Sequence, residues 1–184
     1  MYRFSLSLLV LFIIPLKTLA QENRLLSFSY YNWSERMTIN DGVGNSIDAP
    51  SNLAAVGIQF DYLSSLKNSG WLYSAALLTG SGTGGLSSSY LASYQPFFGL
   101  MGSAAYFFKV EKRVYLELGP MLLFRTLKWP DASGNSAVSG SDINFGATAN
   151  LRVRLFKNLD YCQSIGTLLS KASTIWSLGF GYRF

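Results

Sequence analysis

The chain has 184 residues, enough for one domain, and carries 15 Lys and Arg against 10 Asp and Glu. The basic residues are scattered, so the composition does not indicate a nucleic-acid-binding protein. Histidine is absent, which excludes a Ser-His catalytic triad, and the single Cys162 has no partner for an internal disulfide. The mean hydropathy is positive (+0.21), although no apolar run after residue 20 approaches the length of a membrane-spanning helix.

Residues 1–20 have the features of a cleaved secretory signal peptide. A basic residue near the start precedes an apolar run at 5–14, and small residues at 18–20 offer a cleavage site. The run is shorter than the roughly 20 residues that a membrane-spanning helix needs. We therefore expect an exported mature chain of residues 21–184 that forms a single domain. Its net charge falls from +5 to +3, because Arg3 and Lys17 leave with the signal.

Eight segments of the mature chain alternate between apolar and small or polar residues with a period of two. A β-strand produces this pattern when its two faces meet different surroundings. The segments lie at about 24–37, 54–62, 70–79, 90–108, 114–125, 143–155, 159–169 and 176–184. The seventh is the weakest, because Gln163 and Ser164 blur both faces. Pro120 would remove a ladder hydrogen bond from the fifth, so we expect a bulge or a locally open pairing there.

The final segment carries the clearest signal. Its apolar face consists of Trp176, Leu178, Phe180, Tyr182 and Phe184, and its other face holds Ser, Gly and Arg. A terminal Phe on the apolar face resembles the closing strand of a bacterial outer-membrane β-barrel, and the whole mature chain resembles the small OmpA/OmpX-type barrels. Segments of roughly 10 alternating residues are typical of such proteins. The resemblance implies that Trp176, Phe180, Tyr182 and Phe184 belong to the signal read by the barrel-assembly machinery.

We therefore expect an all-β protein, a monomeric, antiparallel, up-and-down transmembrane barrel of eight strands. It would lie in the outer membrane with both termini in the periplasm. Long connections at 38–51, 80–89 and 128–142 alternate with short ones at 63–69, 111–113 and 157–158, as for outside loops and periplasmic turns. The connection at 169–173 is short where a long one was expected. The alternative fold is an exported sandwich or lipocalin-like barrel.

Aromatic residues support this topology, because Trp and Tyr prefer the two membrane interfaces. One group is expected near the periplasmic rim and another near the outer rim. The periplasmic group is Phe60, Tyr62, Trp71, Tyr73, Tyr106, Phe108, Tyr161, Tyr182 and Phe184, and the outer group is Tyr31, Trp33, Tyr90, Tyr94, Phe124, Trp129 and Trp176.

Three patterns that could suggest a ligand or a catalytic site have simpler explanations. Residues 80–85 match GxGxxG, but no helix is expected after them, so we interpret them as a surface loop. The Asn and Asp residues at 40, 41, 45 and 48 lack the spacing of an EF-hand and fit a polar turn. The Ser-rich stretches at 87–89 and 133–141 have no His to activate a nucleophile. We expect no cofactor, no metal and no enzymatic activity, and a lipid-modifying enzyme is the least favoured alternative.

The polar faces of the segments predict the contents of the lumen. They carry Glu117, Arg125, Arg152, Arg154, Lys109, Arg183, Gln59 and Asp61, together with Thr148 and Asn150. An eight-stranded barrel has room inside only for side chains, and charges confined there must be paired. We predict that Glu117 pairs with Arg152 or Arg154. This network would either plug the barrel and fix its register or act as an ion gate, as the resemblance implies for some OmpA-type barrels.

For the function, we expect a structural or interaction protein of the cell envelope. It would contact outer-membrane lipid and lipopolysaccharide, and its long loops would be available to surface partners; no nucleic-acid partner is expected. The alternative is a narrow passage for small or hydrophobic solutes. Such a passage would need an open lumen or a lateral gap near the weak seventh segment.

Overall fold

The computed structural model describes residues 23–40, 46–64, 68–84, 95–130, 136–169 and 173–184. The expected signal peptide, the Ser-rich stretch at 87–89, and Tyr90 and Tyr94 lie outside these residues. The same holds for the side chains of Trp129, of the Asn and Asp cluster between residues 40 and 48, and of the Ser-rich stretch at 133–141.

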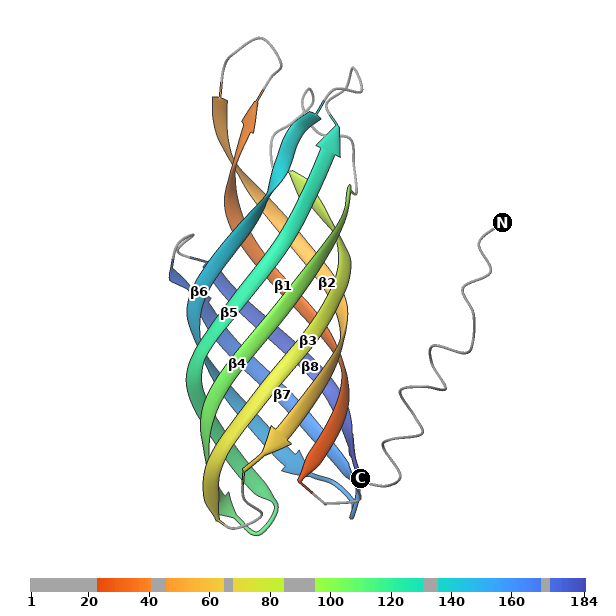
Figure 1. Cartoon of the computed structure of the whole chain (residues 1–184), viewed down its shortest axis with the longest axis vertical. Coiled ribbons are helices and arrows are strands. Elements are labelled where there is room, and N and C mark those ends of the chain that lie inside the picture. The colour runs from red at the N-terminus through yellow and green to blue at the C-terminus, as the bar shows by residue number, and fades with distance from the viewer. Residues whose placement is uncertain (1–22, 41–45, 65–67, 85–94, 131–135, 170–172) are drawn as a thin grey trace, which may run out of the picture.

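Eight antiparallel strands form a closed barrel, in which each strand pairs with its neighbours in sequence and β8 pairs with β1 (Figure 1). The strands are β1 (Arg24–Asn40), β2 (Ser46–Leu63), β3 (Ser69–Gly84), β4 (Gln95–Glu111), β5 (Val114–Pro130), β6 (Ser136–Arg154), β7 (Leu159–Leu168) and β8 (Ser173–Arg183). The predicted up-and-down barrel is confirmed, and the sandwich alternative is wrong. The part of the chain described by the structure contains no helix that is long and apolar enough to cross a membrane.

The pairing register sets the tilt of the strands. A path of directly paired residues leads from Ile143 in β6 through Phe124 in β5 and on around the barrel. It returns to β6 at Val153, ten residues further along (153 − 143). A stagger of this size is typical of strands tilted by about 40° from the barrel axis, with an interior just wide enough for side chains to fill.

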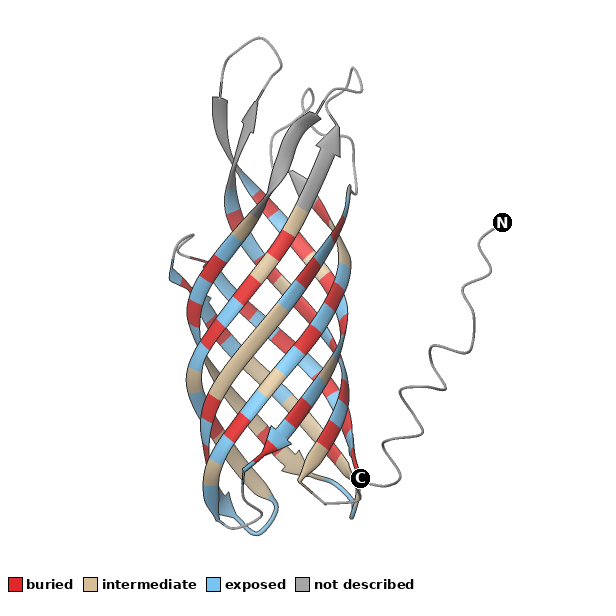
Figure 2. Cartoon of the chain, in the orientation of Figure 1, coloured by how far each residue is buried: buried red, intermediate tan, exposed pale blue. Residues whose placement is uncertain are grey.

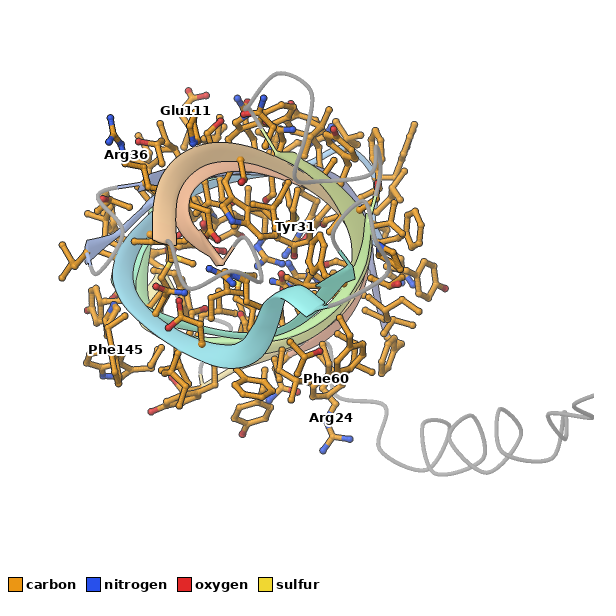
Figure 3. All side chains as sticks on the ribbon, turned by 90° about the horizontal axis from the view of Figure 1, so that it is seen from above. Arg24, Tyr31, Arg36, Phe60, Glu111 and Phe145 are labelled. Atoms are coloured by element: carbon orange, nitrogen blue, oxygen red, sulfur yellow. The ribbon has the colours of Figure 1, made fainter. Side chains whose placement is uncertain are left out.

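Side chains alternate between the lumen and the outer surface, most regularly in β8, where buried and exposed residues follow each other from Ser173 to Arg183 (Figure 2). In the view along the barrel, Phe60 and Phe145 point outward and Tyr31 points into the lumen (Figure 3). The outward faces are strongly apolar. Phe28, Ile58, Leu77, Phe145 and Ile165 are each more than half exposed. A band of large apolar side chains around a closed barrel is the surface that meets hydrocarbon in transmembrane β-barrels.

At the barrel end opposite the termini, most strands extend further than predicted. The connections expected at 38–51, 80–89 and 128–142 are largely strand, since β1 continues to Asn40 and β3 to Gly84. The first five residues of the GxGxxG match are therefore part of β3 and not of a loop. β4, by contrast, begins at Gln95 and not near Tyr90. Small and polar residues on both faces remove the alternating pattern, whereas the backbone ladder continues without it.

The β7–β8 hairpin is much shorter than the others. β7 and β8 have 10 and 11 residues, whereas β6 has 19. β1 pairs with β8 only as far as Trp33, and β6 pairs with β7 only from Gly146 onward. Beyond these points β1 and β6 approach each other without forming a ladder in the described residues. The ladder is therefore shorter at this hairpin, whose strands end at Leu168 and begin again at Ser173.

Pro120 marks an interruption of the ladder between β4 and β5. The pairs run as far as Ser103 with Met121 and resume at Tyr106 with Leu118. This confirms the locally open pairing predicted at this residue. The adjacent Gly119 allows β5 to approach β4 closely, because a Cβ atom there would lie only 2.2 Å from the carbonyl oxygen of Ala104.

Candidate functional site in the barrel lumen

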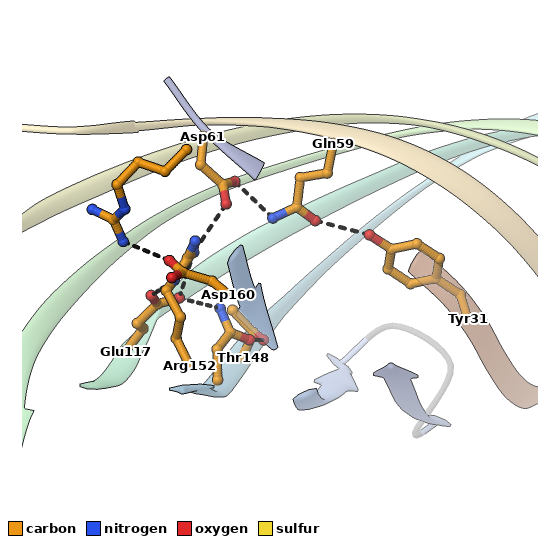
Figure 4. Close-up of polar contacts among 9 residues, drawn as sticks. Tyr31, Gln59, Asp61, Glu117, Thr148, Arg152 and Asp160 are labelled. Atoms are coloured by element: carbon orange, nitrogen blue, oxygen red, sulfur yellow. Dashed lines mark hydrogen bonds and ion pairs between the residues drawn. The ribbon is translucent and has the colours of Figure 1, made fainter. Parts of the chain in front are cut away.

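Arg152 is the central residue of the polar contacts in the half of the lumen near the termini (Figure 4). It lies two residues before the end of β6. Its Nε donates to Oε1 of Glu117 on the adjacent strand β5 at 2.6 Å. Its Nη2 reaches across the barrel to Oδ2 of Asp61 on β2 at 2.9 Å. All three side chains are buried. Of the two partners predicted for Glu117, the structure has Arg152 and not Arg154.

Neutral side chains extend this contact in both directions. On one side, Nε2 of Gln59 donates to Asp61 at 2.7 Å, and the hydroxyl of Tyr31 donates to Gln59 at 2.8 Å. On the other, Nδ2 of Asn150 donates to Glu117 at 3.1 Å and Thr148 donates to Asn150 at 2.8 Å. The resulting chain of contacts, which we call the Arg152 network, joins β1, β2, β5 and β6 through the lumen. These hydrogen bonds give partners to buried carboxylate and amide groups, which would cost free energy if they were buried without partners.

A second ionic group lies at the same end, around Asp160 of β7. Nη2 of Arg183 contacts its Oδ2 at 2.5 Å, and Nε of Arg154 lies 3.7 Å from its Oδ1. The guanidinium of Arg154 also lies 5.7 Å from the centre of the Tyr115 ring. Lys109 lies on the lumen side of β4, and no ion pair joins it to a described residue.

The remaining predicted cation, Arg125, lies near the opposite end and does not join the Arg152 network. It pairs with the buried carboxylate of Glu35 on β1 and lies 3.3 Å from Oδ2 of Asp142 on β6. The indole nitrogen of Trp33 donates to Glu35 at 3.3 Å. Sequence reasoning missed Glu35 and Asp142, although their positions in the alternation of β1 and β6 place them on the lumen side.

Between the two ends the lumen is apolar, which the sequence analysis did not predict. A cluster of buried side chains, which we call the apolar layer, consists of Tyr31, Trp33, Leu53, Ala55, Ala76, Leu78, Phe97, Met121, Leu123, Leu168 and Ile175. It belongs to the half of the barrel away from the termini, since Phe97 lies near the start of β4 and Leu168 ends β7. The predicted network of polar side chains therefore occupies only part of the lumen.

Tyr31 and Trp33 also correct the predicted outer aromatic group. Both are 1% exposed and point into the lumen, because the period of two that places Tyr30 outside places its odd-numbered neighbours inside. The ring of Trp33 packs edge-on against Phe97, with their centroids 5.4 Å apart. In the periplasmic group, by contrast, Phe60, Tyr62, Trp71, Tyr73, Tyr106, Phe108 and Tyr182 are all exposed on the outer surface.

A small cavity of about 40 Å³ lies between the Arg152 network and the apolar layer. Its lining includes Ser27, Ser29, Gln163 and Cys162 as well as Arg152. A site of this size and polarity has room for a few water molecules, since one needs roughly 10–15 Å³ measured in this way. The described residues include no group of three or more Cys, Asp or Glu side chains that could hold a metal ion.

The residues assigned to the assembly signal lie on the outer face of β8 and just beyond it. Trp176, Phe180 and Tyr182 are exposed, and the ring of Phe180 packs against Tyr161 with a centroid distance of 5.7 Å. Phe184 follows the last residue of β8, and its backbone nitrogen donates to the carbonyl of Arg24 in β1 at 3.2 Å. These contacts place the C-terminus at the seam where the barrel closes.

The closed barrel and its apolar outer band define a transmembrane β-barrel. Comparison with solved structures supports this class. The fold is similar to that of Ail, the attachment invasion locus protein of Yersinia pestis, solved in complex with the heparin analogue sucrose octasulfate (20% identity, TM-score 0.55, 88% of this chain and 99% of that chain). It is also similar to Neisserial surface protein A (14% identity, TM-score 0.52, 87% of this chain and 97% of that chain). No family model matches the chain, and the comparison with curated proteins found no match.

The chain thus has the fold of the small eight-stranded outer-membrane β-barrels of the OmpA/OmpX type.

Proposed function

We propose that this protein is a non-conducting scaffold of the bacterial outer membrane, with its termini in the periplasm and its extended hairpins at the cell surface. The observation that carries the proposal is the filling of the lumen. Ion pairs cross it near the termini, the apolar layer fills the other half, and the cavity between them is only about 40 Å³. Such an interior supports the proposal of a plugged barrel.

The extended hairpins support a role in surface contacts. β1–β2 and β5–β6 rise well beyond the tip of the β7–β8 hairpin (Figure 1). Their backbone is paired in a β-ladder, so binding a partner would cost little further backbone entropy. We propose these hairpins as the interaction surface of the protein.

The likeness to Ail is no argument for the same ligand. Ail was solved with a heparin analogue, a polyanion. In this chain, the sequence around the connections at the end opposite the termini carries equal numbers of cations and acids, if the lumen charges are left out. The cations are Arg36, Lys128 and Lys171, and the acids are Asp41, Asp48 and Asp131. Equal numbers of opposite charges in the sequence do not favour a polyanionic partner through electrostatic steering.

Conductance measurements in planar bilayers test the closed lumen. The wild-type barrel should show no channels above the protein-free baseline. A Trp33→Ala and Phe97→Ala double variant removes two large rings from the apolar layer and should conduct, because a widened and wetted constriction no longer excludes ions. Phe98→Ala, which removes a ring from the outer face next to Phe97, is the matched control and should remain silent. A conducting wild-type protein would overturn the proposal.

A further inference from the structure

Two turns at the termini end of the barrel adjoin each other and combine cations with exposed apolar side chains. The β4–β5 turn contains Lys112 and Arg113, and the β6–β7 turn contains Lys157. The turns are held together by Arg113, whose carbonyl oxygen accepts a hydrogen bond from the backbone nitrogen of Arg154 at 2.8 Å. The guanidinium of Arg113 also reaches the carbonyl oxygen of Leu155 at 3.5 Å. We call this surface the basic turn patch; it consists of Val110, Lys112, Arg113, Leu155, Phe156 and Lys157.

The cations of the basic turn patch are available to a ligand. Lys112, Arg113 and Lys157 are all exposed, and none of them forms an ion pair with another described residue. The one acid in these turns, Glu111, leaves the patch with a net charge of +2. The apolar members are equally exposed, since 70% of Phe156 and 54% of Val110 are accessible.

The patch lies where the net charge of the protein is concentrated. In the lumen, the five cations, four Arg and Lys109, are matched by five acids. Outside the lumen at the termini end, the described residues include four cations, Arg24, Lys112, Arg113 and Lys157, against one acid, Glu111. A surplus of charge at one end of a membrane protein points to a ligand of opposite charge on that side.

The neighbours of the patch identify this ligand as lipid. Exposed aromatic residues, which favour the membrane interface, flank both turns: Phe108 precedes the first, and Tyr182 accepts a hydrogen bond from Nδ2 of Asn158 in the second at 3.2 Å. Apolar side chains beside cations are the combination that inserts into the boundary between acyl chains and anionic headgroups. We propose that the basic turn patch binds the headgroup phosphates of anionic glycerophospholipids in the leaflet around the termini.

This inference rests on the proposed orientation for its biological setting, but its test does not. The barrel is reconstituted in nanodiscs of equal phosphatidylglycerol and phosphatidylcholine, and spin-labelled forms of both lipids measure their relative association by electron spin resonance. The wild-type protein should prefer phosphatidylglycerol about fivefold, as expected for one strongly interacting cation. The preference should disappear at about 1 M salt, where charges are screened beyond roughly 3 Å.

The triple variant Lys112→Gln, Arg113→Gln and Lys157→Gln should bring the preference close to one. Arg36→Gln, which removes an exposed cation beyond the opposite end of the outer apolar band, should leave it unchanged, and a Lys112→Arg and Lys157→Arg variant should retain it. Equal association of both lipids with the wild-type protein, or an unchanged preference in the triple variant, would overturn the inference. The inference would also be overturned if the wild-type protein bound isolated peptidoglycan instead of lipid, and if the triple variant lost this binding. Conductance is measured separately, so failure of the closed-lumen proposal would be seen independently.

Discussion

At the scale of single residues, Arg152 is the side chain on which the polar half of the lumen depends. Its contacts reach both the adjacent strand β5 and the opposite strand β2. Desolvation offsets much of the attraction within a buried ion pair, so such a pair adds little net stability. Removal of one partner is different, because it leaves a buried charge uncompensated. We therefore interpret the Arg152 network as a device that fixes which strands face each other.

This interpretation predicts a large effect of Glu117→Ala. The variant leaves Arg152 with Asp61 as its only carboxylate partner within the network, and we expect the free energy of unfolding to fall by about 3 kcal/mol. Urea titration in lipid vesicles measures the change, and Glu111→Ala, at an exposed turn position, is the control and should alter stability by less than about 0.5 kcal/mol. Equal stabilities of the two variants would contradict the role assigned to Glu117. The bilayer conductance of Glu117→Ala should remain at baseline, since the apolar layer is intact.

A second residue-scale prediction concerns Gly119. A Cβ atom there would lie 2.2 Å from the carbonyl oxygen of Ala104, so Gly119→Ala must push β5 away from β4. We expect a loss of about 1–3 kcal/mol, the usual cost of overpacking. The matched control is Gly102→Ala on β4, where the nearest atom, the carbonyl oxygen of Ser74, would be 3.8 Å away and no strain is expected. If both variants unfold at the same urea concentration, the close approach at Gly119 is not a constraint.

At the scale of elements, the β7–β8 hairpin sets the outer limit of the hydrocarbon. A tilted strand needs about 9–11 residues to cross a membrane, which is the length of β7 and β8. Above the hairpin, β1 and β6 have edges without a ladder, and unpaired backbone groups are not tolerated in lipid. The membrane must therefore end near Ser173.

Arginine substitutions on the outer face of β8 test this placement. Leu178 lies midway along the strand, so Leu178→Arg should cost about 2–4 kcal/mol of folding stability. Thr174 lies one residue from the tip of the same strand, and Thr174→Arg should cost no more than about 1 kcal/mol. Folding equilibria in phospholipid vesicles compare the two variants. Similar costs at both positions would mean that the hydrocarbon extends past the hairpin.

The sequence predicted these elements where membrane contact shapes them. Within the apolar band, the alternation of residues such as Phe28, Ile58 and Phe180 identified the strands and their outer faces. It failed beyond the band, where Gly80–Gly84 and neighbouring segments contain small or polar residues on both faces. It also failed inside the lumen. Trp33 and Leu123 lie on the lumen face of their strands. Because the prediction of the lumen considered only polar side chains, it did not include the packed apolar side chains.

At the scale of the whole molecule, the lumen and the charge divide the barrel into two unlike halves. The half with the termini contains crossing ion pairs, and the cationic turns lie on its rim. The other half resembles the core of a soluble protein, with Trp33, Phe97 and Leu123 packed together, and its ionic group of Arg125 and Glu35 lies at the far end. Packing of this kind fills space without costly desolvation of charge. We therefore expect the apolar half to be the barrier to water and the polar half to fix the register.

The uneven rim also determines how the apolar layer can be reached from outside. Leu168 and Ile175 belong to that layer and lie at the tip of the short hairpin, where Ser173 donates a hydrogen bond to the backbone of Ser34. Other members of the layer, such as Leu53, Leu78 and Leu123, lie further from the ends of their strands. We therefore expect an apolar solute that approaches from this end to reach the layer sideways, over the short β7–β8 hairpin and close to the lipid, and not along the barrel axis.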